Sequence, residues 1–285
     1  SVAALEEGVV TTSERILDLG IFDEVFPPAK CNIYPGSHGS VNISDALKVS
    51  CNYFFYEMGY RLSTESSGRY NEKLGIKRLQ KYAEMFGLNA KSGVEVYEKA
   101  PHISDKDPIR TAIGQSTNAF TPVQMARYIT TVADRGTVYN LTLIDKILDK
   151  SGNVILDNKA SVYNKLTDIK SSTWDAVQQG MYEVVNESGG SVYDTFKDLG
   201  VTVAGKTGTS QISKVVPNNA LFISYAPYED PKIAVAVVIP QGHTSGNAAE
   251  LARDIYKLYF HLGDKDKLID NNVTLPENNM GAFAD

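Results

Sequence analysis

Two apolar runs in the last third of the chain, 220–226 and 233–239, are separated only by a short segment that contains Pro227 and Pro231. So few residues cannot form the crossover that parallel strands require, so the two runs must pair as an antiparallel hairpin. A third apolar stretch, 201–204, precedes them and is predicted to be another strand. Any fold of this chain therefore contains an antiparallel sheet near its C-terminal end.

The sequence before this hairpin predicts mainly helices. Thr121-Pro122-Val123-Gln124 is a helix start, because threonine can cap the helix, proline fits its first turn and glutamine completes a capping box. Helical periodicity predicts further helices over 44–50 with Ser44 as N-cap, 53–60, 72–86, 172–187 and 248–262. Residues 21–41 are predicted to be a loop, and residues 141–156 a hairpin that turns at 150–153. Helices followed by strands and a last helix indicate an α+β fold with an antiparallel sheet packed against a helical cluster.

Composition excludes several classes of protein. The net charge is −6 with basic residues scattered, so no nucleic-acid partner is expected. No apolar run approaches the roughly 20 residues that a membrane span needs. We expect one domain over 1–262, followed by a polar, acidic tail over 263–285 that is disordered.

Two cysteines, Cys31 and Cys51, are too few for a disulfide framework and lack the C-x-x-C spacing of a metal site. We interpret them as buried free thiols, and a single disulfide between them remains the alternative. His38 and His243 are interpreted as structural or surface residues, because no Ser-His-Asp pattern accompanies them. No cofactor and no metal are expected.

The predicted strand over 201–204 leads into Lys206-Thr207-Gly208-Thr209-Ser210. A lysine, two hydroxyls and a glycine at a strand end offer a positive charge, hydrogen-bond donors and room for a ligand backbone. Such an edge can bind an extended peptide as an added strand. Taken alone, the K-T-G triplet is equally typical of an ordinary polar strand end.

A second polar triplet, Ser50-Cys51-Asn52, lies at the break between two predicted helices. Its serine could relay a proton, and its asparagine could orient a peptide amide within the same cleft. Serine and asparagine are common at helix ends, so the triplet alone is weak evidence. Combined with K-T-G about 155 residues later, it is far more specific, because S-x-x-K, S-D-N and K-T-G mark penicillin-binding proteins and class A β-lactamases.

Over residues 1–262 the chain resembles the transpeptidase domain of class B penicillin-binding proteins, with the elongation-type branch nearest. The resemblance is carried by His38-Gly39-Ser40-Val41, Ser50-Cys51-Asn52-Tyr53-Phe54-Phe55-Tyr56, Ala112-Ile113-Gly114-Gln115, Thr121-Pro122-Val123-Gln124-Met125-Ala126 and Lys206-Thr207-Gly208-Thr209-Ser210. It implies the fold shared by serine β-lactamases and these transpeptidases. It also implies a serine-type D,D-transpeptidase, an acyltransferase of peptidoglycan biosynthesis that acts in cell shape and is acylated by β-lactams.

The resemblance also implies roles for individual residues. Lys206 would support the site electrostatically and, with Ser50, relay a proton toward the leaving group. Asn52 would bind the substrate amide, while Thr207, Gly208 and Thr209 would bind the substrate, including its terminal carboxylate. The implied partners are peptidoglycan stem peptides ending in D-Ala-D-Ala, β-lactam antibiotics and a cell-wall glycosyltransferase of the elongation complex. The implied location is the extracytoplasmic face of the bacterial cell membrane, with an anchoring segment before Ser1.

The sequence departs from the family pattern in one important respect, because it contains no S-x-x-K. Residues 1–9 read as a helix already under way, which indicates a truncated chain. The resemblance implies that the nucleophilic serine, its lysine and the first sheet strands precede Ser1 in the parent protein. The fragment alone is then expected to be inactive. A smaller departure is Ser116, where the family usually has glycine.

Two other functions remain open from the sequence. The first is a D,D-carboxypeptidase or a β-lactamase of the same fold, although the Ile113-Gly114-Gln115 and Thr121-Pro122 segments favour a transpeptidase. The second is a non-catalytic sensor or pseudoenzyme that binds peptidoglycan without turnover. This last reading predicts that the parent gene encodes no S-x-x-K before Ser1.

Overall fold

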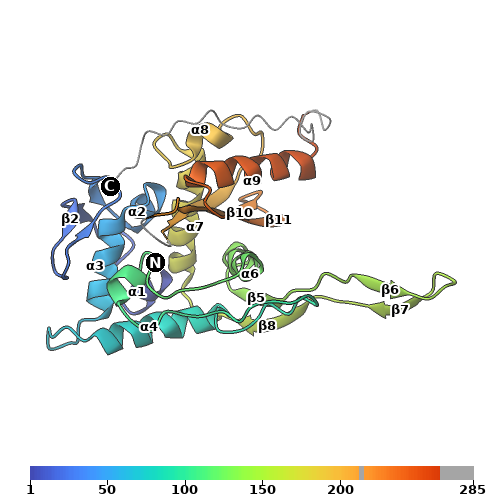
Figure 1. Ribbon diagram of the computed structural model, residues 1–285, viewed down its shortest axis with the longest axis horizontal. Coiled ribbons are helices and arrows are strands. Elements are labelled where there is room, and N and C mark those ends of the chain that lie inside the picture. The colour runs from blue at the N-terminus through green and yellow to red at the C-terminus, as the bar shows by residue number, and fades with distance from the viewer. Residues whose placement is uncertain (212–214, 264–285) are drawn as a thin grey trace.

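The computed structural model of the chain describes residues 1–211 and 215–263 (Figure 1). The predicted tail over 263–285 lies outside the described residues, except for Gly263. The helices are α1 Val2–Glu6, α2 Ile43–Lys48, α3 Asn52–Leu62, α4 Glu72–Met85, α5 Pro108–Thr111, α6 Pro122–Ala133, α7 Ser171–Asn186, α8 Tyr193–Phe196 and α9 Ser245–Tyr259. The strands are β1 Ile16–Asp18, β2 Ile21–Phe22, β3 Ala29–Lys30, β4 Gly39–Val41, β5 Thr137–Asn140, β6 Lys146–Leu148, β7 Val154–Asp157, β8 Ser161–Lys165, β9 Ala204–Ser210, β10 Asn219–Ala226 and β11 Ile233–Ile239.

The three C-terminal strands form one antiparallel sheet in the order β11-β10-β9. Phe222 of β10 and Val237 of β11 lie in the same core cluster as Tyr256 of α9, which covers one face of the sheet (Figure 1). Tyr225 of β10 belongs to a second cluster with Trp174 of α7 and helix α6 on the opposite face. The predicted α+β architecture is therefore confirmed, with the sheet between two helical layers.

Helix α2 is held against α7 by close packing. A Cβ at Gly180 of α7 would lie only 2.8 Å from the Leu47 side chain and 3.0 Å from the Ser44 backbone, so glycine is required at this approach. The Ser44 hydroxyl donates to the Ala176 carbonyl at 2.9 Å. The prediction that Ser44 caps this helix is wrong, because Asn42 is the N-cap and forms a capping box with Asp45. This leaves the Ser44 hydroxyl available to bind α7.

The chain turns sharply between α2 and α3 at Ser50. The Ser50 N–H donates to the Leu47 carbonyl at 3.2 Å and the Cys51 N–H to the Ala46 carbonyl at 2.9 Å, which are the two hydrogen bonds of a Schellman motif. Ser50 adopts φ of +56°, in the position that glycine usually occupies. A side chain costs about 1 kcal/mol or more in this left-handed conformation, so the serine is strained.

Local sequence signals predicted several other elements correctly. The capping box of Thr121 and Gln124 is present at the start of α6, and the predicted 141–156 hairpin forms as β6 and β7, which project from the body (Figure 1). The loop predicted over 21–41 is partly wrong, because short strands β2, β3 and β4 pair within it or with β1. None of the helices within residues 1–211 and 215–263 is long and apolar enough to cross a membrane.

The left-handed turn predicts an order of stability for variants at Ser50. Ser50→Gly and Ser50→Ala both remove the hydroxyl, but only glycine adopts φ near +56° without strain. The free energy of unfolding of Ser50→Gly should therefore exceed that of Ser50→Ala by about 1 kcal/mol. Urea unfolding followed through Trp174, the single tryptophan, measures the difference.

The matched control is the same pair of substitutions at Ser44, which lies inside α2. There alanine should be the more stable variant, because glycine is unfavourable within a helix by about 1 kcal/mol. Equal stabilities for the two Ser50 variants would contradict a strained turn.

Candidate active site

The two polar triplets predicted from the sequence meet in the structure. Ser50 lies at the turn between α2 and α3, and Lys206 lies in β9. The Lys206 Nζ donates to the Ser50 Oγ at 2.7 Å. It also lies 3.1 Å from the Thr207 carbonyl oxygen and 3.3 Å from the Thr207 hydroxyl. An ammonium group with three oxygen partners at a sheet edge can exchange a proton with the serine hydroxyl.

Burial changes the acidity of this lysine. Desolvation in the space between β9 and the Ser50 turn lowers the pKa of Lys206 to about 8. A lysine with a pKa of about 8 can give up and regain a proton during a reaction, which an ordinary exposed lysine does far less readily. The lysine therefore combines the geometry and the acidity of a proton-relay group.

The register of β9 places its residues on two faces. Residues directly opposite each other in an antiparallel pair share a face. Lys206 and Gly208 lie opposite Ile223 and Leu221, whereas Thr207 and Thr209 lie opposite Phe222 and Ala220. The strand predicted over 201–204, with the motif at its end, begins later than expected: β9 runs from Ala204 to Ser210 and contains the motif.

Two of the predicted residues are less closely tied to the lysine. Asn52 is the first residue of α3, and within the described part of the chain its side chain forms no hydrogen bond to Lys206, Thr207 or Thr209. Thr209 is exposed, and its carbonyl accepts from the Gln115 side chain at 3.4 Å. The Ile113-Gly114-Gln115 segment thus reaches the same strand as the lysine.

Strand β9 is an edge of its sheet. It pairs with β10 on one side, and among the described residues no strand pairs with its other side. The unpaired backbone groups of an edge strand can bind an extended peptide by adding it to the sheet. Lys206 and the Thr207 hydroxyl lie along this edge, where they can bind polar groups of such a peptide.

The family of the chain follows from comparison with known sequences. The family model "Penicillin binding protein transpeptidase domain" matches residues 1–257. The chain therefore belongs to the transpeptidase domains of penicillin-binding proteins, and the resemblance found from the motifs is confirmed. The match extends from the first helix into α9 and includes both polar triplets.

Among curated relatives, the chain is 29% identical over 296 residues to the peptidoglycan D,D-transpeptidase MrdA of Haemophilus influenzae, covering 92% of this chain and 43% of the relative. It is 28% identical over 280 residues to penicillin-binding protein 2B of Streptococcus pneumoniae, covering 89% of this chain and 41% of the relative. The relatives belong to class B, as predicted. The chain spans less than half the length of each of them.

Solved structures show the same fold. Penicillin-binding protein 2B of Streptococcus pneumoniae strain R6 superimposes with a TM-score of 0.78 at 24% identity, covering 92% of this chain and 46% of that one. The penicillin-binding protein PBP2 of Helicobacter pylori, solved in complex with MreC, gives a TM-score of 0.77 at 22% identity, covering 92% and 48%. The predicted transpeptidase fold is thus confirmed.

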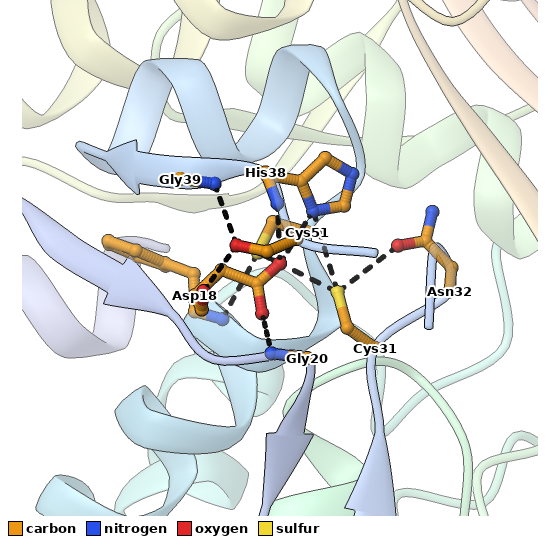
Figure 2. A network of polar contacts seen from close by, with 9 residues as sticks. Asp18, Gly20, Cys31, Asn32, His38, Gly39 and Cys51 are labelled. Atoms are coloured by element: carbon orange, nitrogen blue, oxygen red, sulfur yellow. Dashed lines mark hydrogen bonds and ion pairs between the residues drawn. The ribbon is translucent and has the colours of Figure 1, made fainter. Parts of the chain in front are cut away.

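A second polar cluster adjoins the Ser50 turn, where Asp18, Cys31, His38 and Cys51 converge (Figure 2). Asp18 ends β1, Cys31 follows β3, His38 precedes β4 and Cys51 caps α3. Asp18 and both cysteines are buried. The thiols are free, as the sequence predicted.

The hydrogen bonds around Asp18 favour its ionised carboxylate form. Burial opposes its ionisation, but hydrogen bonds from the His38 N–H at 3.1 Å and the Gly20 N–H at 2.7 Å outweigh this and lower the pKa of Asp18. In the adjoining thiol pair, hydrogen bonding from Cys51 lowers the pKa of Cys31, while the same contact raises that of Cys51.

The four donor atoms can hold a divalent metal ion. Tetrahedral zinc bonds of about 2.3 Å to sulfur and 2.0–2.2 Å to nitrogen or oxygen imply edges of about 3.7 Å between sulfurs and about 3.5 Å from sulfur to nitrogen or oxygen. The two sulfurs lie 3.9 Å apart, Cys31 Sγ lies 3.5 Å from His38 Nδ1, and Cys51 Sγ lies 3.5 Å from Asp18 Oδ2. The Nδ1–Oδ2 edge of 2.8 Å is shorter than the roughly 3.3 Å of a tetrahedral site, as expected for a hydrogen bond.

Sequence reasoning missed this cluster because it considered only the spacing of the two cysteines and found no metal motif. Asp18 and His38 come from a region predicted to be mostly loop, and only folding brings them to the thiols. An acid, a histidine and two cysteines within residues 18–51 were the available signal. The expectation of no metal stays a prediction, and this donor geometry argues against it.

The lowered pKa of Lys206 predicts a distinct titration. In the folded chain, nuclear magnetic resonance of labelled lysines should show one side chain titrating near pH 8, and this signal should be missing in Lys206→Gln. Between pH 8 and the ordinary lysine pKa of about 10.4, the unfolded chain binds more protons, so this group makes stability rise with pH. Titration of Lys206 together with all the other lysines would contradict its lowered pKa and therefore its assignment as a proton-relay group.

The thiol cluster predicts zinc binding at about one ion per chain. Ligand binding to the folded state stabilises it by about 2.7 kcal/mol at 100 times the Kd, so zinc should raise the Tm and a chelator should reverse the rise. Cobalt should give the absorption of a tetrahedral thiolate complex.

The zinc-dependent rise should disappear in His38→Ala and persist in His102→Ala, an exposed histidine outside the cluster. An unchanged Tm for the unsubstituted chain with zinc, together with no cobalt spectrum, would show that the cluster holds no metal.

Proposed function

We propose that this chain is the substrate-positioning part of a peptidoglycan D,D-transpeptidase, an elongation-type class B penicillin-binding protein. One observation carries the proposal: the 2.7 Å contact between Lys206 Nζ and Ser50 Oγ. It joins the two family motifs beside a sheet edge that no strand pairs with in the described part of the chain. The family match over residues 1–257 and the MrdA relative support it.

In the proposed reaction, a stem peptide that ends in D-Ala-D-Ala lies along β9. A serine of S-x-x-K, contributed by a segment before Ser1, attacks the carbonyl of the penultimate residue and forms an acyl-enzyme. The Lys206–Ser50 pair passes a proton to the nitrogen of the leaving D-alanine. An amine from a second stem peptide then attacks the ester, which forms the cross-link and frees the serine.

The other motif residues are proposed to position the peptide. Thr207 and Thr209 would bind its terminal carboxylate, assisted by the positive charge of Lys206, and Gly208 would leave space for its backbone. The Thr209 N–H would be one oxyanion donor, a kind of group whose loss typically costs about 10²–10³ in rate. Asn52 begins α3 two residues beyond Ser50 and would bind the amide of the substrate.

The chemistry also suggests where the parent protein acts. Peptidoglycan stem peptides lie outside the cytoplasmic membrane, so we propose an extracytoplasmic location with a membrane anchor in the parent. The Helicobacter pylori relative was solved with MreC. By analogy, the parent would act in an assembly for cell elongation that includes a glycosyltransferase.

Covalent labelling by a fluorescent penicillin tests the proposal. A protein with only the printed sequence should not be labelled, because it has no S-x-x-K. The full-length product of its gene should be labelled, and Lys206→Ala should slow that labelling by about 10²-fold or more, since proton-relay groups typically contribute about 10²–10⁴. Lys232→Ala, which changes a lysine in the β10–β11 connection, is the control and should label normally.

The same full-length protein separates the alternatives. Rapid β-lactam hydrolysis would indicate a β-lactamase, and release of D-alanine without cross-linking to an acceptor amine would indicate a carboxypeptidase. A full-length protein that binds peptidoglycan but is never labelled would overturn the proposal in favour of a non-catalytic sensor.

A further inference from the structure

We propose that Cys31 and Cys51 are an oxidisable thiol pair, which forms a reversible intramolecular disulfide in the same cluster that can hold a metal ion. The pair lies outside the peptide-binding edge and takes no part in the reaction proposed above. The inference concerns a modification site of this chain, and its chemistry stands whether or not the parent cross-links peptidoglycan.

The geometry of the two sulfurs carries the inference. Their separation is 3.9 Å, and a disulfide bond of about 2.05 Å requires them to approach by about 1.9 Å. The two sulfurs face each other within the cluster (Figure 2). Cys31 also contacts His38 Nδ1 at 3.5 Å and the Asn32 side-chain oxygen at 3.3 Å, which leaves its sulfur several weak partners rather than one strong one.

The surroundings make Cys31 the first thiol to react. Cys31 is buried, but the residues that follow it, 32–37, are exposed and form a turn at the surface. Opening this turn uncovers Cys31 without disturbing a helix. Cys51 is completely buried at the start of α3. An oxidant therefore reaches Cys31 first, and Cys51 is placed to resolve the product.

The reaction balances with a small disulfide such as oxidised glutathione as the oxidant. The Cys31 thiolate attacks one glutathione sulfur, which breaks the glutathione S–S bond and releases one reduced glutathione. The Cys51 thiolate then attacks the Cys31 sulfur of this mixed disulfide and releases the second reduced glutathione. Two electrons pass from the protein to the oxidant, and the two thiol protons end on the two glutathione thiols.

Metal binding and oxidation exclude each other in this cluster. A bound ion needs both sulfurs as thiolates about 3.7 Å apart, whereas the disulfide brings them to about 2.05 Å and removes their charge. Oxidation therefore leaves only Asp18 and His38 for the ion, and metal binding protects the thiols. The cluster has two covalently distinct states that compete for the same sulfur atoms.

Oxidation also acts on the candidate active site through the chain itself. Cys51 stands between Ser50 and Asn52, and its sulfur accepts the Phe54 N–H at 3.5 Å at the N-terminus of α3. Moving this sulfur toward Cys31 weakens the cap and pulls on the turn that presents Ser50 to Lys206. The extracytoplasmic location, which rests on the proposed function, would expose the pair to oxidising conditions.

The test uses the chain with its sequence unchanged, freed of metal by a chelator and equilibrated in glutathione buffers of increasing oxidised fraction. After acid quenching and alkylation, intact mass and peptide mapping should reveal a Cys31–Cys51 disulfide in the monomer. Saturating zinc should slow its formation at least tenfold. Hydrogen exchange in the peptide that contains residues 50–54 should accelerate after oxidation, while exchange in α9 should not change.

Single variants provide the controls. Cys51→Ser should stop at the mixed glutathione disulfide of Cys31, whereas Cys31→Ser should react with glutathione much more slowly because Cys51 is buried. Should either variant fail to fold, the experiment with the unsubstituted chain still decides. Both thiols remaining fully alkylatable in the most oxidised buffer, or a disulfide that forms only in urea or only between chains, would overturn the inference. Since no penicillin or peptide enters the experiment, its result is independent of the transpeptidase proposal.

Discussion

The left-handed turn at Ser50 is the constraint on which both polar clusters depend. It ends α2 with the two hydrogen bonds of a Schellman motif and starts α3 immediately afterwards. Two adjacent residues consequently contribute to two different clusters: Ser50 contacts Lys206 of β9, and Cys51 contacts Asp18 and Cys31. The close approach of α2 to Gly180 of α7 fixes this turn relative to the rest of the protein.

The strain at Ser50 is consistent with a functional position. Glycine would satisfy the turn at lower free-energy cost, but it has no hydroxyl to offer Lys206. The charged form of Lys206 is also destabilised, because its ammonium group loses hydration in the site and contacts only neutral oxygen atoms. Both residues lower the stability of the folded chain but allow a short contact between a hydroxyl and an amine. Such a loss of stability at a functional position is characteristic of catalytic sites.

The sequence predicted those parts of the fold that depend on local signals. The β10–β11 hairpin follows from two apolar runs and a short connection, and α6 follows from the Thr121 capping box. The N-cap of α2 was misplaced because serine and asparagine two residues apart are both good caps, and only the packing of Ser44 on α7 decides between them. The strand before the motif was predicted over the apolar residues 201–204, whereas β9 begins at Ala204 and includes Thr207 and Thr209, which an edge strand tolerates.

The candidate active site could be predicted only because its motifs resemble a known family. Nothing local in the sequence brings Ser50 to Lys206, and the resemblance supplied that juxtaposition. No family motif in the sequence analysis pointed to the cluster of Asp18, Cys31, His38 and Cys51. Its ligand atoms come from short strands and turns whose pairing depends on tertiary contacts, so only the folded structure revealed it.

The two clusters also differ in how much of the chain must be made before each can form. The thiol cluster is complete by Cys51, with its most distant contact spanning 33 residues, whereas the Lys206–Ser50 contact spans 156 residues. Contacts of long sequence separation form late, and the N-terminal part of a chain emerges first during synthesis. A nascent chain thus contains all four residues of the thiol cluster well before the lysine has been made. The thiols can therefore meet a metal ion or an oxidant during synthesis, before Lys206 is available to contact Ser50.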